Sequence, residues 1–288
     1  MSFTSRRTFL KTTGAVAAAA CVGAGRLEAA ALRTPMGLQL YSVRNQLPTD
    51  FDGTLAKLGK IGYTVVEAAG YYGRTASDFR ASMSKAGLRC VSTHHTLELL
   101  ETQLDQWIDY GKTLGLEYMV CSSSGGMHRD PEAKGPKTLD DWRWCAEQFN
   151  KVGEKVKAAG MTFGVHNHTP EFETLDGVVV YDELLRLTDP KLVIFEMDCG
   201  WVYASGHDPV DYLSKTPERF PLIHVKDIVK GADGKVHMPV LGTAKPEYAP
   251  ILKAATHLKY FFVEQEQFDM DPFEELRLDE EYMRKLDV

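Results

Sequence analysis

The sequence contains three short apolar runs that end in charged or imidazole side chains: Leu192-Val-Ile-Phe-Glu-Met-Asp198, Pro221-Leu-Ile-His-Val-Lys-Asp227 and Tyr260-Phe-Phe-Val-Glu-Gln-Glu266. Continuous apolar runs of this length are typical of buried parallel strands. A charged group at such a strand end is costly to desolvate unless a counter-charge or a metal ion meets it. A capping or salt-bridge role would explain any one of these ends, but the three together predict one shared site formed by Asp198, His224 and Glu264.

Predicted strands and helices alternate from Met36 to the end of the chain. The strands are expected at residues 36–41, 64–67, 88–94, 117–121 and 161–166, followed by the three runs above. The helices are expected at residues 51–61, 76–86, 97–114, 138–160, 182–187, 209–214, 247–256 and 271–286, several of them stopped by a glycine. Eight such units in about 250 residues predict an α/β fold, a single-domain (β/α)8 TIM barrel. A doubly wound sheet is the alternative, since one missed strand would change the count.

The first residues do not fit this alternation. Ser5-Arg6-Arg7-Thr8-Phe9-Leu10-Lys11 precedes an Ala-rich run, and small residues near Ala31 offer a cleavage site. This segment resembles a twin-arginine signal peptide, which implies export of the folded chain to the periplasm. We therefore divide the chain into a signal peptide, residues 1–31, and a barrel domain, residues 32–288.

A membrane anchor is not expected. The apolar part of the signal is too short and too rich in Ala and Gly to form a stable membrane span. Cys21 follows three alanines, as in a lipoprotein acceptor site, but Ala18 stands where leucine is usual, so a lipid anchor at Cys21 is the less favoured alternative. The remaining cysteines form no CxxC pair and are expected to be buried free thiols: Cys90, Cys121, Cys145 and Cys199.

Composition limits the class of partner. The 288-residue chain is 44% hydrophobic and 25% charged, with a net charge of −7 and a pI of about 5.7. Nucleic acids are bound through clustered Lys and Arg, and the sequence has no basic stripe. We therefore expect a small-molecule ligand and no nucleic acid, and the sequence leaves the oligomeric state open, a homo-oligomer included.

Polar side chains occur at nearly every predicted strand end. In a TIM barrel these ends meet at one mouth, where the active site lies. The residues concerned are Gln39, Tyr41, Glu67, His94, His95, Ser122, His166, Asn167, His168, Asp198, His224, Lys226, Asp227, Glu264 and Glu266. Carboxylates with one or two imidazoles suit one divalent ion, Mn²⁺, Mg²⁺, Co²⁺ or Zn²⁺, without strong discrimination.

These motifs resemble the sugar phosphate isomerase/epimerase family, the xylose-isomerase-like barrels. The resemblance rests on Gly164-Val-His-Asn-His-Thr-Pro-Glu-Phe172, Asp198-x-Gly200-Trp201, His224-Val-Lys226-Asp227 and Val263-Glu264-Gln265. It implies one divalent metal ion held by Glu, Asp, His and Glu from the fifth to the eighth strands. Asp198, His224 and Glu264 match three of these ligands.

The fourth ligand departs from the family pattern. Where many relatives have Leu-Glu-Asn-His, this chain has Val165-His166-Asn167-His168. Either His166 replaces the glutamate, or the loop that follows brings Glu171 to the metal. The sequence leaves both open, and we favour Glu171 because it restores three carboxylates and one imidazole.

The resemblance also implies proton transfer beside a metal-polarised carbonyl. Glu264 is the expected base, with Glu171 as its candidate counterpart. His95 is expected to bind a sugar hydroxyl or transfer a proton, or else to be structural. Lys226 is expected either to stabilise an oxyanion or to pair with Asp227 or Glu67.

We therefore expect a metal-dependent isomerase or epimerase of an unphosphorylated sugar or keto-sugar, because export takes it where sugar phosphates are scarce and there is no phosphate-binding glycine loop. A lyase or hydratase acting on a 3-keto-glycoside is the alternative, since one base suffices for it. An abasic-site endonuclease and a non-catalytic sugar-binding protein are weaker candidates. The acidic charge and the single metal site count against the nuclease.

Overall fold

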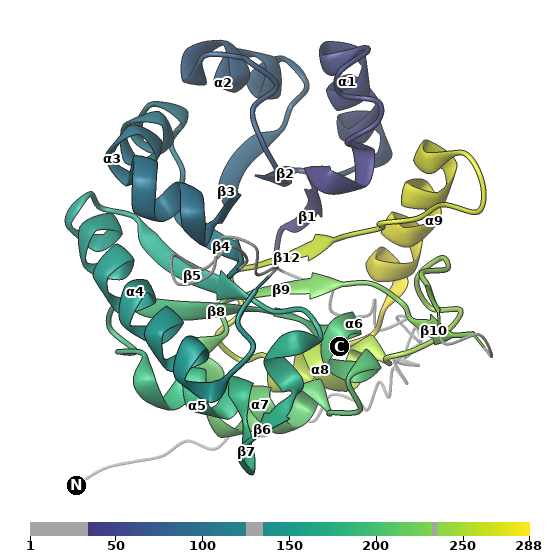
Figure 1. Cartoon of the computed structure of the whole chain (residues 1–288). Coiled ribbons are helices and arrows are strands. Elements are labelled where there is room, and N and C mark those ends of the chain that lie inside the picture. Colours follow the sequence, from purple (N-terminus) through teal and green to yellow (C-terminus); the bar gives the residue numbers. More distant parts are fainter. Residues whose placement is uncertain (1–33, 125–134, 232–234) are drawn as a thin grey trace, which may run out of the picture.

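A closed barrel of eight parallel strands forms the centre of the protein (Figure 1). The computed structural model describes residues 34–124, 135–231 and 235–288. The predicted signal peptide, with Cys21, lies outside the described residues, as does most of the loop after the fourth strand. The barrel strands are β1 (Met36–Gln39), β2 (Val65–Ala68), β3 (Arg89–Thr96), β4 (Tyr118–Ser123), β5 (Thr162–His166), β8 (Val193–Asp198), β9 (Leu222–Val225) and β12 (Tyr260–Val263).

Each strand of the barrel pairs with the next one along the chain, and β12 pairs with β1 to close it. In this closing pair, Met36 is opposite Phe261 and Leu38 is opposite Val263. The predicted TIM barrel is thereby confirmed, and the doubly wound sheet, which is open, does not form.

Helices surround the barrel (Figure 1). They are α1 (Phe51–Ile61), α2 (Ala76–Lys85), α3 (Leu97–Leu114), α4 (Leu139–Ala158), α5 (Val180–Leu187), α6 (Cys199–Ala204), α7 (Pro209–Lys215), α8 (Tyr248–Ala254) and α9 (Pro272–Lys285). Thr138 caps α4 as predicted, since its side chain accepts from the backbone N–H of Asp141 at 3.2 Å.

Several short elements were not expected from the sequence. The described residues include three 3-10 turns, η1 (Leu40–Val43), η2 (Pro170–Phe172) and η3 (Pro217–Arg219), together with the short helix α6. Two small hairpins pair β6 (Thr174–Leu175) with β7 (Val178–Val179) and β10 (Val229–Lys230) with β11 (Val236–His237). Strands of two residues are too short to give a periodic pattern.

The barrel interior is apolar at one end and polar at the other. Its apolar part is a separate cluster formed by Val65, Val91, Tyr118, Val120, Leu222, Tyr260 and Phe262. Phe262 fits there because β1 has glycine at position 37, where a Cβ would come within 2.4 Å of the phenyl ring. The next inward positions towards the C-terminal ends of the strands are polar, so the fold directs these side chains to the mouth.

Two further expectations concern thiols and membranes. Cys90, Cys121, Cys145 and Cys199 are buried thiols outside any disulfide bond, as predicted. Among the described residues, no helix is both long enough and apolar enough to cross a membrane.

Candidate metal centre and active site

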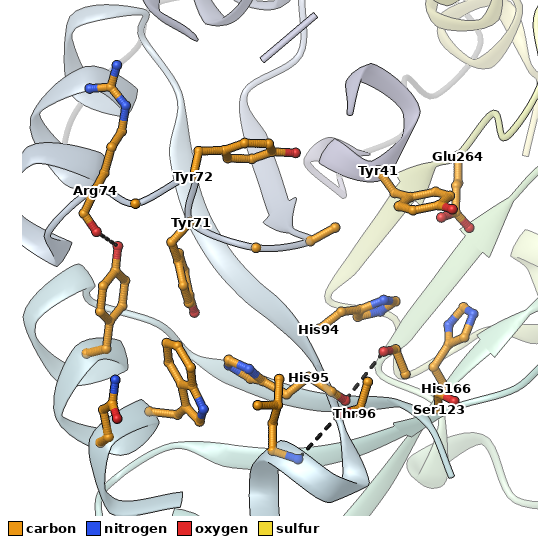
Figure 2. Close-up of a pocket in the computed structure, with 18 of the residues that line it drawn as sticks. Tyr41, Tyr71, Tyr72, Arg74, His94, His95, Thr96, Ser123, His166 and Glu264 are labelled. Carbon is orange, nitrogen blue, oxygen red and sulfur yellow. Dashed lines mark hydrogen bonds between the residues drawn. The ribbon is translucent and has the colours of Figure 1, made fainter. Parts of the chain in front are cut away.

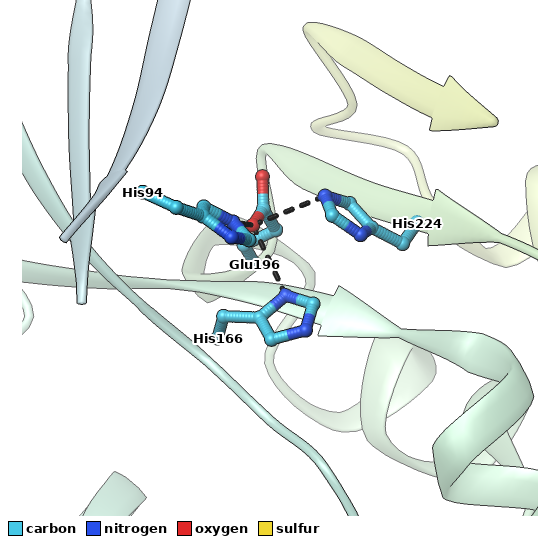
Figure 3. Close-up of side chains that lie close together, drawn as sticks. All are labelled: His94, His166, Glu196 and His224. Atoms are coloured by element: carbon cyan, nitrogen blue, oxygen red, sulfur yellow. Dashed lines mark hydrogen bonds and ion pairs between the residues drawn. The ribbon is translucent and has the colours of Figure 1, made fainter. Parts of the chain in front are cut away.

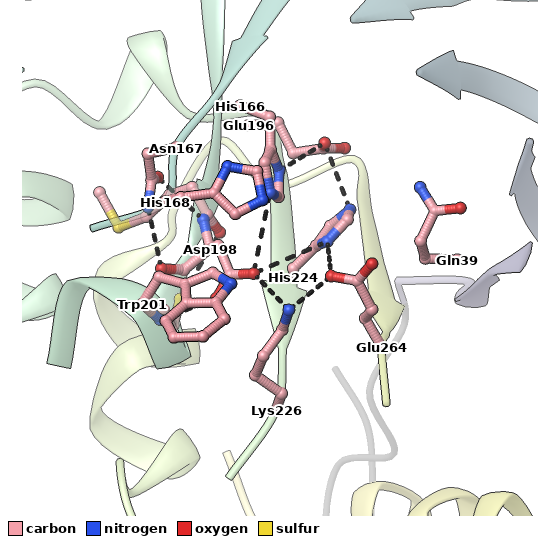
Figure 4. Close-up of polar contacts among 12 residues, drawn as sticks. Gln39, His166, Asn167, His168, Glu196, Asp198, Trp201, His224, Lys226 and Glu264 are labelled. Carbon is pink, nitrogen blue, oxygen red and sulfur yellow. Dashed lines mark hydrogen bonds and ion pairs between the residues drawn. The ribbon is translucent and has the colours of Figure 1, made fainter. Parts of the chain in front are cut away.

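Four ligand-type side chains converge at the barrel mouth (Figure 4): His166 of β5, Asp198 of β8, His224 of β9 and Glu264 just after β12. One ligand atom from each lies within 4.8 Å of the others, and all four residues are buried. We call these four residues the outer set. Alternation along the strands explains the convergence, because Asp198, His224 and Glu264 follow apolar inward residues by two or four positions.

Asp198 has one carboxylate oxygen engaged by the fold and one facing the site. Its Oδ1 accepts the backbone N–H of Trp201 at 2.9 Å and thus caps α6. Its Oδ2 is buried and forms an ion pair with the ammonium of Lys226 at 2.9 Å. A buried carboxylate oxygen of this kind fits a metal ligand.

Lys226 places a positive charge beside the outer set. Its Nζ lies 2.5 Å from Glu264 Oε2 and 2.9 Å from both Asp198 Oδ2 and Glu266 Oε1. Burial lowers the pKa of Lys226, but Asp198, Glu264 and Glu266 outweigh burial and raise it. Gly200 is required here, because a Cβ at that position would lie 2.4 Å from Lys226 Cγ.

A second group of side chains lies around Glu196 (Figure 3). Three imidazole nitrogens surround one oxygen, Glu196 Oε2: His94 Nε2 at 2.7 Å, His166 Nδ1 at 3.1 Å and His224 Nε2 at 3.2 Å. We call His94, His166, Glu196 and His224 the inner set. Their ligand atoms also lie within 4.8 Å of one another.

Glu67 holds two of the imidazoles from the other side. Its Oε2 lies 2.8 Å from His224 Nε2 and 2.9 Å from His94 Nε2. Gln39 donates to the same oxygen at 2.7 Å, and the Ser92 hydroxyl donates to Oε1 at 2.5 Å. Both carboxylate oxygens of Glu67 are therefore fixed, and so are the rings that they contact.

Burial and neighbouring charges shift the pKa values of several of these residues in opposite directions. Burial lowers the pKa of His224, but Glu196, Glu264 and Glu67 outweigh it and hold the pKa well above its ordinary value. Burial raises the pKa of Glu264, but Lys226 and His224 hold it well below its ordinary value. Burial lowers the pKa of His166 well below its ordinary value. Glu264 is thus a carboxylate, and His166 is a neutral imidazole with a lone pair for an ion.

A cavity of about 830 Å³ opens beside the metal-ligand residues (Figure 2). Glu264, His166 and His94 line it on the barrel side, and an aromatic wall includes Tyr71 and Trp107. This volume is in the range that holds a small organic molecule. Of the two carboxylates in the outer set, Glu264 lines the cavity and Asp198 does not.

His95 belongs to the wall of this cavity. Its ring centroid lies 4.9 Å from that of Trp107 and 6.0 Å from that of Tyr71. Its Nε2 is buried and has no hydrogen-bond partner within the described ranges. Burial lowers the pKa of His95 to about 3, so this side chain is a neutral hydrogen-bonding group.

Glu171 lies apart from both sets. It is buried in η2, and its Oε2 accepts the backbone N–H of His168 at 2.8 Å. Burial raises the pKa of Glu171 to about 7. His166 occupies the fourth position of the outer set in the structure, whereas the sequence had favoured Glu171 for it.

The structure brings together His166, Asp198, His224, Glu264 and Lys226, and it places His95 on the cavity wall. The Lys226 ammonium forms its ion pairs with Asp198, Glu264 and Glu266, and not with Asp227 or Glu67, the partners considered from the sequence. Glu196 is the residue that the sequence analysis missed. It stands two positions before Asp198, so strand alternation places both on the same face and could have identified it.

Comparison with known proteins gives relatives in sequence and solved structures of similar fold. An inosose dehydratase of Geobacillus kaustophilus is 27% identical over 193 residues, and the match covers 62% of each chain. The matched part is thus less than two thirds of that relative. A solved sugar phosphate isomerase/epimerase from Parabacteroides distasonis is 28% identical with a TM-score of 0.74, covering 89% of this chain and 95% of the other. IOLI protein, solved with a bound zinc atom, shares the fold at 11% identity, with a TM-score of 0.67, over 86% of this chain and 96% of its own.

Two family models match the sequence. Residues 4–23 match the twin-arginine translocation pathway signal sequence, which confirms the N-terminal resemblance. Residues 55–286 match the second model, which spans most of the barrel. The chain therefore belongs to the xylose isomerase-like TIM barrel family.

Proposed function

We propose that this protein is a metal-dependent enzyme that removes a proton from the carbon beside the carbonyl of an unphosphorylated, sugar-like ketone and then eliminates water. The observation that carries the proposal is the position of Glu264, a buried carboxylate that belongs to the outer set and also lines the cavity. It can contact an ion and a substrate at once.

The outer set would hold one divalent ion. Two imidazoles and two carboxylates fit such an ion, and Asp198 Oδ2 is a buried oxygen beside the ammonium of Lys226, a position that an ion can share. Lys226 would then pair with Glu266, which already lies 2.9 Å from its Nζ. When bound, the ion supplies Lewis-acid polarisation of the substrate carbonyl.

Glu264 would accept the proton. The pKa of Glu264 is held low by Lys226 and His224, so the side chain is a carboxylate before substrate binds. Lys226 is buried and does not line the cavity, so we assign it a positioning role and not contact with an oxyanion. His95 lines the cavity as a neutral ring and would bind a substrate hydroxyl.

The single carboxylate base favours elimination. His166 stands where the family pattern has a second glutamate, and the other carboxylate of the outer set, Asp198, does not line the cavity. Glu264 is thus the one carboxylate of the outer set that can reach both the ion and the substrate. In the elimination, Glu264 takes the proton from carbon, the C–O bond at the next carbon breaks, and the same carboxyl returns a proton to the leaving hydroxyl as water. The name inosose dehydratase among the relatives supports this reading over epimerisation.

An isomerase is the second candidate. A single base can also move a proton between neighbouring carbons on one face of a sugar, and the relative from Parabacteroides distasonis is named an isomerase/epimerase. A panel of inososes and keto-sugars incubated in deuterated buffer separates the two reactions. Elimination gives a product lighter by one water, and isomerisation gives a product of unchanged formula apart from deuterium.

The dependence of turnover on metal distinguishes the proposed enzyme from a sugar-binding protein that has no catalytic activity. Turnover that disappears after chelation and returns with Mn²⁺ supports the enzyme. Substrate binding without any turnover or C–H exchange, with and without metal, would contradict it.

We further propose that residues 1–31 are removed on export and that residues 32–288 form the mature barrel in the periplasm. The match of residues 4–23 to the twin-arginine signal supports this location.

A further inference from the structure

The inner set has the make-up of a transition-metal site. It offers three imidazoles and one carboxylate, from β3, β5, β8 and β9, and none of the four side chains is exposed. Imidazole nitrogens favour Zn²⁺ and related ions, whereas carboxylates favour Mn²⁺ and Mg²⁺. The two sets therefore differ in the ion they suit, since the outer set has two carboxylates.

Hydrogen bonds alone do not match the acceptor capacity of the two carboxylate oxygens of Glu196. Three imidazole nitrogens crowd around Oε2, within 2.7–3.2 Å, although one carboxylate oxygen has about two acceptor sites. The other oxygen, Oε1, is buried and has no hydrogen-bond partner in the described part of the chain. An ion that draws the three nitrogens and one oxygen to itself would resolve this arrangement.

The positive charge of Lys226 is confined to the outer set. Its Nζ contacts Asp198 and Glu264, so an ion there shares its ligands with an ammonium. Among the described residues, the ion-pair partners of Glu196 and Glu67 are histidines alone. The inner set is thus free of a competing lysine or arginine.

Two rings belong to both sets. His166 presents Nδ1 to Glu196 at 3.1 Å and Nε2 towards Asp198 at 3.9 Å. His224 presents Nε2 to Glu196 at 3.2 Å and Nδ1 to Glu264 at 3.1 Å. A neutral imidazole has one lone pair, so it can serve an ion on one side at a time.

We propose that the inner set is a second, alternative metal position, selective for Zn²⁺ or Co²⁺, which competes with the outer set for His166 and His224. The protein then holds one ion at a time, with carboxylate-preferring ions in the outer set and imidazole-preferring ions in the inner set. This site is additional to the outer one and does not depend on the proposed reaction.

The test uses variants that each touch one set. Glu196→Gln and His94→Asn replace residues that belong to the inner set alone, and Asp198→Asn replaces a residue that belongs to the outer set alone. The purified, metal-free proteins are titrated with Zn²⁺ against a chromophoric chelator, with Mn²⁺ by electron paramagnetic resonance, and with Co²⁺ by visible absorption. Circular dichroism and thermal unfolding confirm that each variant is folded.

We expect Glu196→Gln and His94→Asn to lose about 100-fold or more in Zn²⁺ affinity, because loss of a ligand should cost at least as much as loss of a residue that supports one, while Mn²⁺ affinity changes less. Asp198→Asn should lose Mn²⁺ affinity and change less in Zn²⁺ affinity. It should keep one Zn²⁺ per chain and give the Co²⁺ absorption of a four-coordinate site. Zn²⁺ should also displace Mn²⁺ from the wild type.

Equal Zn²⁺ affinity in wild type and in both inner variants would overturn the inference and leave Glu196 as a hydrogen-bonding support of the outer ligands. Two ions bound together by the wild type would overturn the competition. Failure of Mn²⁺ to bind the wild type, with Zn²⁺ binding intact, would contradict the proposed function instead.

Discussion

His224 Nε2 lies 2.8 Å from Glu67 Oε2, and both groups are fully buried. This contact turns Nδ1 of the same ring towards Glu264 and the outer set. A carboxylate behind a ligating histidine fixes its tautomer and orientation. Although Glu67 lies outside both sets, it is expected to control metal binding through His224.

Glu67→Gln should therefore lower Mn²⁺ affinity by about 10–100-fold, since the amide binds the ring more weakly than the carboxylate does. Glu275→Gln is a control, because Glu275 is a buried glutamate whose Oε2 accepts the backbone N–H of Asp269. Mn²⁺ titration checks both variants. Equal affinity in Glu67→Gln and the control would show that Glu67 does not orient the ligand.

His166 and Glu171 can be separated as fourth ligands. His166→Asn should weaken binding of both Mn²⁺ and Zn²⁺, by about 100-fold or more, because this ring contributes to both sets. Glu171→Gln should bind both ions as the wild type does, since its carboxylate contacts the backbone of His168. Loss of the ion from Glu171→Gln, with binding intact in His166→Asn, would instead identify Glu171 as the fourth ligand.

Glu171 should also give the stability a measurable pH dependence. Burial raises its folded-state pKa from 4.5 to about 7, so the folded protein binds a proton that the unfolded chain releases. The stability it contributes is present below about pH 4.5 and is lost as the pH rises through about 7. This loss is about 3 kcal/mol at most.

Glu171→Gln removes this titration. The free energy of unfolding of the variant, relative to wild type, should increase between about pH 4.5 and about pH 8. Chemical denaturation of the variant and the wild type at several pH values measures this difference. A difference that is constant over this range would contradict the assignment of Glu171 as a buried, protonatable group.

The N-terminal signal predicts the route of export. Replacement of Arg6 and Arg7 by lysine should leave the precursor inside the cell, because the resemblance rests on this arginine pair in its motif. Immunoblots of periplasmic and cytoplasmic fractions give the answer. Undiminished export of the double variant would exclude the twin-arginine route.

Much of the fold could be predicted because the apolar periods of strands and helices are local. Apolar runs such as the one ending at Asp198 predicted the strands, and glycines such as Gly62 and Gly115 predicted the helix ends correctly. The small hairpins and α6 could not be predicted, because they are too short for a periodic signal and depend on contacts with the barrel.

The site was predictable where a polar residue ends a strand, and less so elsewhere. Asp198, His224 and Glu264 stood out because each follows an apolar run. Alternation could have placed Glu196 on the same face as Asp198, but its role depends on three rings that arrive from other strands. The placement of Glu171 depends on the backbone of η2, which turns its carboxylate to the N–H of His168. Contacts between distant strands and the backbone course of a loop cannot be read from the spacing of residues along the sequence.

The proton-transfer role of Glu264 is tested most directly by deuterium exchange at the substrate carbon beside the carbonyl, followed by NMR in Glu264→Gln loaded with Mn²⁺. Metal content is measured in the same samples, so that loss of the ion is not mistaken for loss of the base. With the ion bound, we predict exchange that is about 10²–10⁴-fold slower than in wild type, the usual contribution of a general base. Exchange at the wild-type rate in the metal-loaded variant would contradict the account and leave Glu264 as a ligand only.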